Sequence, residues 1–141
     1  MLREIRSARL VKGQDLNHHG TLFAGRIAEW FTESCFLAAS RFLGKPENIV
    51  CVKIHGLAFT KPAHSGDTVE IVTRVVKTGR TSITVCGQVF VNDGAESVVK
   101  GFATFVTVDS AGASYAHGLA LPAEYIEEHR ALHDEAAALP K

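Results

Sequence analysis

The chain has 141 residues, with 15 basic and 15 acidic side chains and 46% hydrophobic residues. This length suffices for one domain with its own core but not for two, and the hydrophobic content excludes a disordered chain. The formal net charge of 0 at pH 7 lacks the basic excess that is typical of a non-specific nucleic-acid binder. We therefore expect a single globular domain with no nucleic-acid partner.

The cysteines and the N-terminal segment bear on the compartment. Cys35, Cys51 and Cys86 are too widely spaced for a zinc or dithiol motif, and each lies in an apolar run. Three buried free thiols are therefore expected, which fits a reducing compartment. The first residues, MLREIRSARLVKG, contain no apolar segment of a signal peptide, and charged side chains interrupt the apolar stretch 22–43. We expect a cytoplasmic protein with no membrane partner.

A first strand is expected at residues 3–11, and a loop containing Gly and Asn follows it. A long helix is expected from Leu22 to about Phe42, because Ala, Leu and aromatic residues are frequent there and Gly44 and Pro46 end it. Its apolar side chains nearly surround the axis, which is typical of a helix buried on all sides.

Alternating apolar residues predict four more strands, at 49–59, 68–76, 81–91 and 97–108. Short turns at 77–80 and 92–96 make the strands that they join antiparallel neighbours. After Pro122, a tail rich in Glu and Ala predicts one terminal helix on the surface or against another subunit. The pattern predicts an α+β domain in which a sheet curls around one long helix.

Several catalytic motifs are absent from the sequence. It contains no GxSxG elbow, no P-loop and no HExxH pair. His129 and His133 lie four residues apart, and His18 and His19 are adjacent, but no further ligands accompany either pair. We therefore expect no metal site.

The segment NHHGTLFAG, residues 17–25, resembles the entry to the central helix in hotdog-fold acyl-CoA thioesterases. Three later stretches resemble the same family in the same order, at 52–71, 77–85 and 103–112. The resemblance covers about residues 3–120. It implies a hotdog fold, in which a five-stranded antiparallel sheet wraps the long helix, with one domain at 1–120 and a C-terminal helical extension at 121–141.

The resemblance implies hydrolysis of acyl-CoA to a free acid and coenzyme A in lipid metabolism, with coenzyme A as part of the substrate and no other cofactor. Phe23, Ala24 and Gly25 would form the oxyanion site, since small residues at a helix start let a carbonyl approach unpaired N–H groups. Asn17 matches the family residue that positions the water, with an Asx turn as the alternative. His19 is a second candidate donor, or else an exposed loop residue.

The candidate base departs from the family pattern. The family acid lies on the helix seven residues after the last glycine, where this chain has Thr32. Threonine cannot act as a general base at neutral pH, so Thr32 orients a water or a carbonyl, or only packs. Glu33 is the candidate base, with a solvated carboxylate as the alternative, and Glu29 is the second choice. Their spacing of four residues favours exposure to solvent, a cleft or a partner.

Coenzyme A phosphates need cations. Arg80, Thr81 and Ser82 match the family region beside the pantetheine channel, and Lys61 and Lys77 are further candidates. The alternative for each of them is an ordinary solvated turn residue, which is the usual role of a Lys or Arg in a turn.

The resemblance also implies a homodimer whose sheets join edge to edge around shared sites, assembled further into a trimer of dimers. Exposed sheet edges need such a partner or a cover. Two other functions remain open: a non-catalytic acyl-CoA-binding hotdog protein, which Thr32 favours, and a hotdog thioesterase that acts on acyl carrier protein. A dehydratase is disfavoured, because no suitably placed pair of histidine and acid is found.

Overall fold

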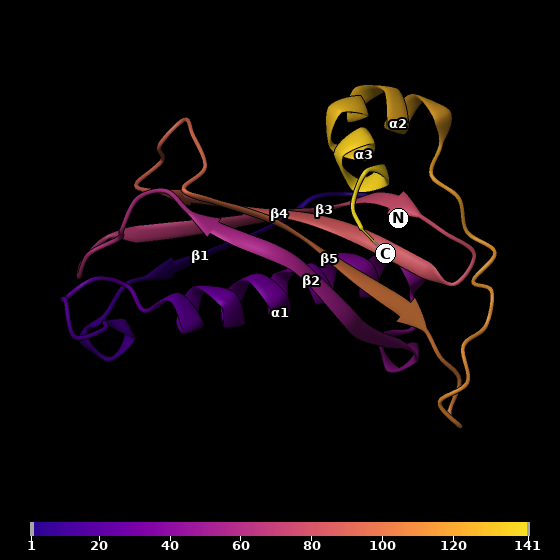
Figure 1. The fold of residues 1–141 in the computed structure, drawn as a ribbon, viewed down its shortest axis with the longest axis horizontal. Helices are drawn as coiled ribbons and strands as arrows, with labels where there is room; N and C mark the ends of the chain where they lie inside the picture. The colour runs from indigo at the N-terminus through magenta and orange to yellow at the C-terminus, as the bar shows by residue number, and fades with distance from the viewer. Residues whose placement is uncertain (1, 141) are drawn as a thin grey trace.

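A computed structural model describes residues 2–140 of the chain (Figure 1). The helices and strands are β1 (Ile5–Leu10), α1 (Ala24–Leu43), β2 (Ile49–Phe59), β3 (Thr68–Thr78), β4 (Ser82–Val91), β5 (Val99–Thr107), α2 (Ala123–Glu128) and α3 (Arg130–Ala137). Each strand expected from the alternating pattern is present, with ends shifted by one or two residues. None of the helices in this part of the chain combines the length and the apolar character that crossing a membrane requires.

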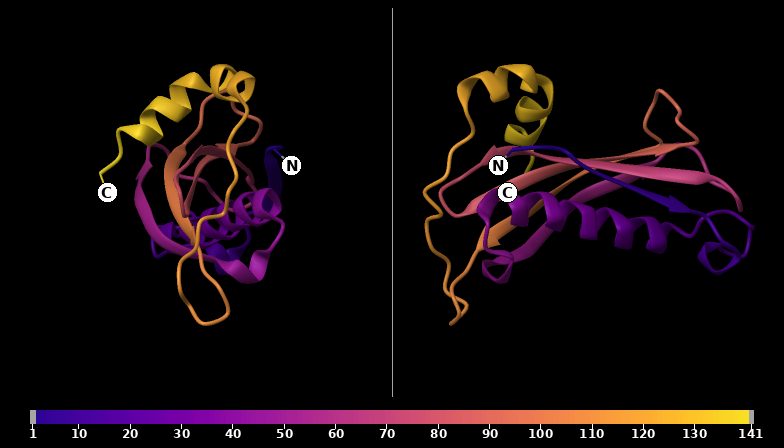
Figure 2. Two further views of the ribbon diagram at one scale, coloured as in Figure 1. Left: turned by 90° about the vertical axis from the view of Figure 1, so that its right-hand side faces the viewer. Right: turned by 180° about the vertical axis from the view of Figure 1, so that it is seen from behind.

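The five strands form one antiparallel sheet in the order β1-β3-β4-β5-β2, so β1 and β2 are its edges. The sheet curves along the length of α1, which lies against one face, here called the inner face (Figures 1 and 2). This arrangement is the hotdog fold, as expected. The antiparallel pairing across both short turns is also confirmed, because β4 pairs with β3 and with β5.

The core between α1 and the inner face is built around Phe31. This side chain is fully buried, and its ring lies against Gly87 of β4 and Gly101 of β5, which are paired across the sheet. A Cβ atom on Gly87 would lie 2.4 Å from Cε2 of Phe31, which is too close for any side chain. The two glycines therefore form the hollow that lets α1 approach the sheet.

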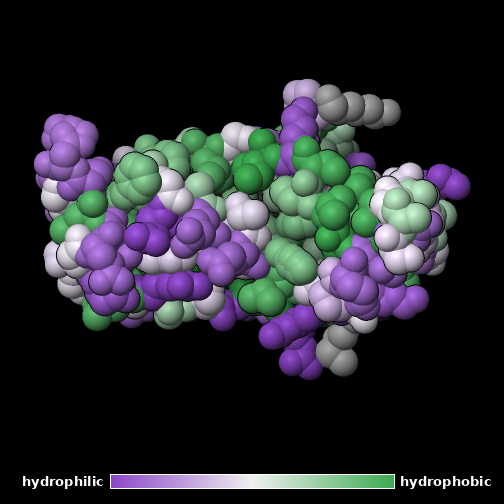
Figure 3. Space-filling model, turned by 90° about the horizontal axis from the view of Figure 1, so that it is seen from below, coloured by the Kyte–Doolittle hydropathy of each residue, from purple (hydrophilic) through white to green (hydrophobic). Residues whose placement is uncertain are grey.

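The expectation of a helix buried on all sides is wrong, because the sheet covers only one side of α1. Leu37 of α1 and Phe23, the residue directly before α1, are both exposed. Figure 3, which looks onto the α1 side, shows hydrophobic surface gathered beside hydrophilic clusters. The expectation of three buried thiols is also wrong: Cys35 and Cys86 are buried, but Cys51 is exposed because it lies on the edge strand β2.

The C-terminal tail forms two short helices in place of the single helix expected. His129 separates them, because its backbone (φ −115°, ψ 32°) is not helical. Both helices lie over the other face of the sheet, here called the outer face (Figure 2). Ala136 of α3 is buried there with Val76, Cys86 and Phe102. The tail thus packs against the sheet of its own chain.

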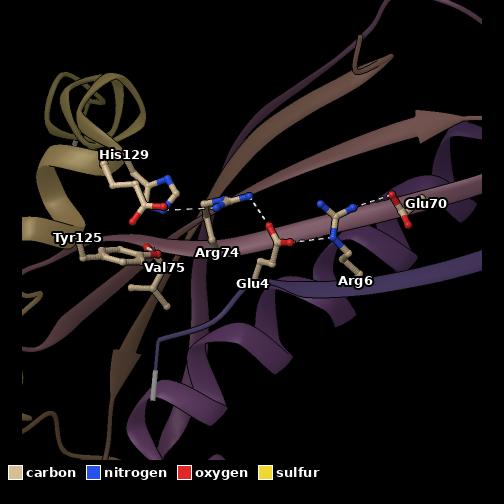
Figure 4. Close-up of polar contacts among 8 residues, drawn as sticks. Glu4, Arg6, Glu70, Arg74, Val75, Tyr125 and His129 are labelled. Carbon is tan, nitrogen blue, oxygen red and sulfur yellow. Dashed lines mark hydrogen bonds and ion pairs between the residues drawn. The ribbon is translucent and has the colours of Figure 1, made fainter. Parts of the chain in front are cut away.

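Polar contacts connect the outer face with the N-terminal segment and with the end of α2 (Figure 4). Arg74 of β3 donates to Glu4, and its Nη1 lies 3.5 Å from Nε2 of His129. Glu4 in turn accepts from Arg6, and the hydroxyl of Tyr125 donates to the backbone oxygen of Val75 over 2.6 Å. The outer face is therefore held by these charged and polar groups together with the apolar cluster around Ala136, whereas the larger apolar clusters lie on the inner face.

Candidate active site

A cleft of about 310 Å³ opens where α1 begins. The loop before α1, the first turns of α1 and the loop between β2 and β3 form its rim, and valines of β3, β4 and the segment before β5 form its apolar floor. Its lining residues are Asn17, Thr21, Leu22, Ala24, Ile27, Phe59, Thr60, Lys61, Pro62, Ala63, Val69, Val89, Val91 and Val98. We call it the helix-entry cleft. Such a cleft suits an apolar ligand that carries one polar group near the rim.

The first backbone N–H groups of α1 point toward the start of the helix, as in any α-helix. Among the described residues, the N–H groups of Ala24 and Gly25 have no acceptor, whereas that of Phe23 donates to the backbone oxygen of Asp15 over 2.8 Å. Of the three expected oxyanion residues, Ala24 and Gly25 thus offer free donors and Phe23 does not. The ring of Phe23 lies over Gly25, where a Cβ atom would come within 2.5 Å of Cε2. Gly25 therefore keeps the helix start compact.

Asn17 lies on the rim of the cleft and also shapes the loop before α1. Its Oδ1 accepts from the backbone N–H of His19 (2.9 Å) and of Thr21 (3.1 Å), and its Nδ2 donates to Oγ1 of Thr21 (3.0 Å). This is the Asx turn that the sequence left open as the alternative reading. One N–H of the amide remains for another acceptor. His19 itself is exposed, lies outside the cleft lining and stacks on His18 with ring centroids 4.0 Å apart.

Asp15 was missed by the sequence reasoning, although it fixes the helix start. Its side chain is buried, accepts from the backbone N–H of Lys12 over 2.9 Å and lies 3.2 Å from Nε of Arg26. Its backbone oxygen receives the N–H of Phe23. In the sequence, Asp15 ends the short turn GQD and lies eleven residues before Arg26 of the helix. This spacing does not indicate that the fold brings the two side chains together.

Thr32 and Glu33 lie away from the helix-entry cleft. Glu33 follows Gly25 by eight residues, which is about 12 Å along the helix axis. Its side chain is 58% exposed, and Oε1 lies 3.9 Å from Nη2 of Arg9. Oγ1 of Thr32 donates to the backbone oxygen of Ala28 over 2.8 Å. Both residues border a separate apolar depression on the exposed side of α1.

Glu29 shares the exposure of Glu33. Its side chain is also 58% exposed, and it lies 3.6 Å from Nη1 of Arg26. The expectation that the two carboxylates face outward is confirmed. One chain therefore does not bring a candidate base to the helix-entry cleft.

The candidate coenzyme A residues are also divided. Lys61 borders the helix-entry cleft, whereas Arg80, Thr81 and Ser82 lie at the other end of β3, a strand of 11 residues that spans about 36 Å. The backbone oxygen of Arg80 accepts from His117. One chain separates the two groups by the length of its sheet.

No group of three His, Cys, Asp or Glu side chains within residues 2–140 is arranged to hold a metal ion. His129 lies beside Arg74, and His133 lies 3.5 Å from Asp134. These histidines contact neighbours in their own chain.

The sequence and the fold resemble those of known proteins. The model of the thioesterase superfamily matches residues 19–98, which is more than half of the chain. The chain belongs to this superfamily. An uncharacterized acyl-CoA thioester hydrolase of Buchnera aphidicola is 30% identical to this superfamily member over 82 residues, which are 58% of this chain and 59% of that protein. The chain thus matches less than two thirds of the length of this relative.

Two solved structures of the superfamily resemble the chain over nearly its whole length. An acyl-CoA hydrolase from Bacillus cereus is 26% identical, with a TM-score of 0.77, and the match covers 95% of this chain and 84% of that one. A hexameric acyl-CoA thioesterase is 27% identical, also with a TM-score of 0.77, over 97% of this chain and 94% of the other.

Proposed function

We propose that this superfamily member hydrolyses acyl-CoA thioesters to a free acid and coenzyme A. The observation that carries the proposal is the helix-entry cleft, whose apolar floor lies beside Ala24; the backbone N–H groups of Ala24 and of the next residue, Gly25, have no acceptor among the described residues. The names of the Buchnera aphidicola relative and of the two solved structures support the same reaction. The free state of all three cysteines supports a cytoplasmic location, where thiols stay reduced.

The chemistry follows from the polarity of the helix start. The thioester oxygen accepts from the N–H groups of Ala24 and Gly25, and water attacks the carbonyl carbon. Negative charge then grows on the oxygen where donors already point, next to the positive end of the α1 dipole. The C–S bond breaks and the sulfur leaves with coenzyme A. The valine floor holds the acyl group, and the remaining amide N–H of Asn17 positions the water.

The general base comes, in this proposal, from Glu33 of the partner subunit. The edge strand β2 supports a homodimer, because Val50, Val52 and Ile54 are exposed along its 11 residues. An exposed apolar edge is stabilised by pairing with a second copy. Such a dimer places the exposed side of one α1 near the other chain. We propose further assembly into a trimer of dimers, which the hexameric relative supports.

The other candidate residues take supporting roles in the same proposal. Thr32 of the partner subunit orients the water through its hydroxyl, and His19 reaches the thioester from the loop. Lys61 on the cleft rim, with the segment Arg80, Thr81 and Ser82 of the partner subunit, binds the phosphates and the pantetheine of coenzyme A. Cations from two chains thus meet around one substrate.

Replacing Ala24 with proline tests the oxyanion site directly. Proline removes one N–H but is tolerated at the first position of a helix, and Phe23 before it has the extended backbone (φ −65°, ψ 129°) that proline requires. We expect kcat for thiol release from a panel of acyl-CoA esters to fall about 10²–10³-fold. Ala24→Ser keeps the N–H and should retain activity. Equal activity of Ala24→Pro and wild type would contradict the proposed oxyanion site.

Two matched variants on α1 test the base. Glu33→Gln and Glu29→Gln each remove a carboxylate with 58% exposure from the same helix. We expect about a 10²–10⁴-fold loss of kcat for Glu33→Gln and little change for Glu29→Gln. Binding of acyl-CoA by the wild type without turnover would favour the non-catalytic binding protein. Turnover of acyl carrier protein esters alone would favour the second alternative.

A further inference from the structure

The outer face of the sheet carries a second hollow, and among its described lining residues only Ser82 has a role in the proposed reaction. It measures about 300 Å³ and lies between β2, the neighbouring ends of β3, β4 and β5, and the end of α3. The helix-entry cleft opens on the inner face, so the sheet separates the two. We call this hollow the outer-face groove.

The side chains of the outer-face groove have one kind of chemistry. Its polar lining consists of two lysines, one histidine and three hydroxyl groups: Lys53, Lys77, His55, Ser82, Thr84 and Thr104. No carboxylate is among its described lining residues. The acid on the adjacent helix α3, Glu135, is already paired with Lys100 over 2.8 Å. Cations and hydroxyl donors without a carboxylate are the surroundings that a phosphate group prefers.

The protonation of the His55 ring decides which atom donates in its hydrogen bond within the groove. Nδ1 of His55 is buried and has no partner, and an unpaired lone pair there costs less than an unpaired N–H, so the proton lies on Nε2. Burial, together with the charge of Lys53, lowers the pKa of His55, which agrees with a neutral ring. Nε2 lies 2.7 Å from Oγ1 of Thr104, which lies 3.3 Å from Oγ1 of Thr84.

This order fixes which groups remain to donate. His55 donates to Thr104, and one of the two threonines donates to the other, so one hydroxyl hydrogen of the pair Thr84 and Thr104 has no acceptor among the described residues. Lys77 likewise has no hydrogen bond or ion pair in this part of the chain, and Lys53 donates only to the backbone oxygen of Pro140 over 3.3 Å. The groove thus presents unsatisfied donors and positive charge to whatever enters it.

We propose that the outer-face groove binds a phosphate-bearing small molecule, with the phosphate between Lys77, Lys53 and the hydroxyl pair of Thr84 and Thr104. The apolar end of α3 forms the other wall and suits the non-phosphate part of the ligand. Lys77, Lys53 and Thr84 have no role in the proposed hydrolysis, and the groove lies on the opposite face from the helix-entry cleft.

Calorimetric titration of the full chain with pyrophosphate, ADP and adenosine tests the site. We expect pyrophosphate and ADP to bind and adenosine not to bind, since the phosphate carries the recognition. Binding of ADP but not of pyrophosphate would identify a nucleotide as the source of the phosphate, and equal binding would identify a free phosphate. Failure of both to bind the wild type would overturn the proposal, whether or not the chain hydrolyses acyl-CoA.

Three variants localise the binding. Lys77→Gln and Thr84→Val should each weaken pyrophosphate binding about tenfold or more, because each removes a donor to a charged group. Lys45→Gln removes the same charge from an exposed loop residue that does not line the groove, and should bind as the wild type does. Equal weakening by Lys45→Gln and Lys77→Gln would show diffuse attraction and overturn the site. Lys77 is partly exposed, so its variant tests the proposal even if Thr84→Val folds poorly.

Discussion

The two faces of the sheet are covered in different ways. On the inner face, α1 presses Phe31 into the hollow of Gly87 and Gly101, and the contact is almost entirely apolar. On the outer face, α2 and α3 cover only part of the sheet, and Arg74 with its acidic and histidine neighbours supplies much of the contact. The larger apolar clusters therefore lie on the inner face. The outer face leaves polar groups open to ligands.

The largest expected effect is on the free energy of unfolding. It compares two variants that each remove a buried aromatic side chain, one on each face of the sheet. Phe31→Ala should lower the free energy of unfolding by about 3–5 kcal/mol, because the rigid hollow beneath it cannot close. Phe102→Ala on the outer face should cost less, since the end of α3 can shift into the space. Urea denaturation followed by circular dichroism measures both, and equal losses would contradict the difference between the faces.

A smaller effect tests the ion pairs of the outer face. The hydrogen bond from Arg6, with the charge of Arg74, lowers the pKa of Glu4 below its ordinary value of 4.5. The folded carboxylate thus binds its proton less readily than the unfolded one. Its contribution is complete above that ordinary value and is lost as the pH falls through the lowered pKa.

Glu4→Gln should therefore flatten the acid side of the stability profile, by about 1 kcal/mol or less for a partly exposed pair. Melting temperatures between pH 3 and 7, which is roughly the range over which carboxylates titrate, measure the effect. Glu47→Gln is the control, because Glu47 is exposed and has no ion pair among the described residues. An unchanged acid profile for Glu4→Gln would show that these charges contribute nothing.

The smallest effect on stability comes from labelling the thiols. Burial raises the pKa of Cys86 on the outer side to about 12 and raises that of Cys35 on the inner side as well. Cys51 on the edge is exposed. A thiol reagent at neutral pH should therefore modify Cys51 first and leave the fold intact. Fast labelling of two or three thiols would show that one of the faces opens readily.

Much of this architecture was predictable from local patterns. Alternation fixed the strands, and Gly44 with Pro46 marked the end of α1, because both signals act between near neighbours. The break at His129 was not predictable, since the tail is helical in composition on both sides of it. Nor was the exposure of Cys51, because an edge strand and a central strand have the same alternation.

The candidate site was predictable only where it is continuous in sequence. Asn17 and Ala24 lie within eight residues, and the structure brings them to one cleft together with Lys61, with Gly25 next to Ala24 at the helix start. Asp15 was missed because its contact with Arg26 depends on how the loop folds back. Within one chain, Glu33 and Arg80 lie away from the cleft. They could reach a cleft only from a second chain, and the local pattern of one sequence does not encode such a contact.

The two edges of the sheet differ in a way that limits how far it can grow. β2 is long and apolar, but its ladder with β5 is interrupted by two register shifts. β1 has only six residues and carries Arg6 and Arg9, both substantially exposed. Short, charged edge strands such as β1 discourage open-ended stacking. A sheet that pairs with the sheet of a second subunit through β2 therefore ends on two β1 strands. Because these strands disfavour the addition of further strands, such pairing gives a closed oligomer rather than a fibre.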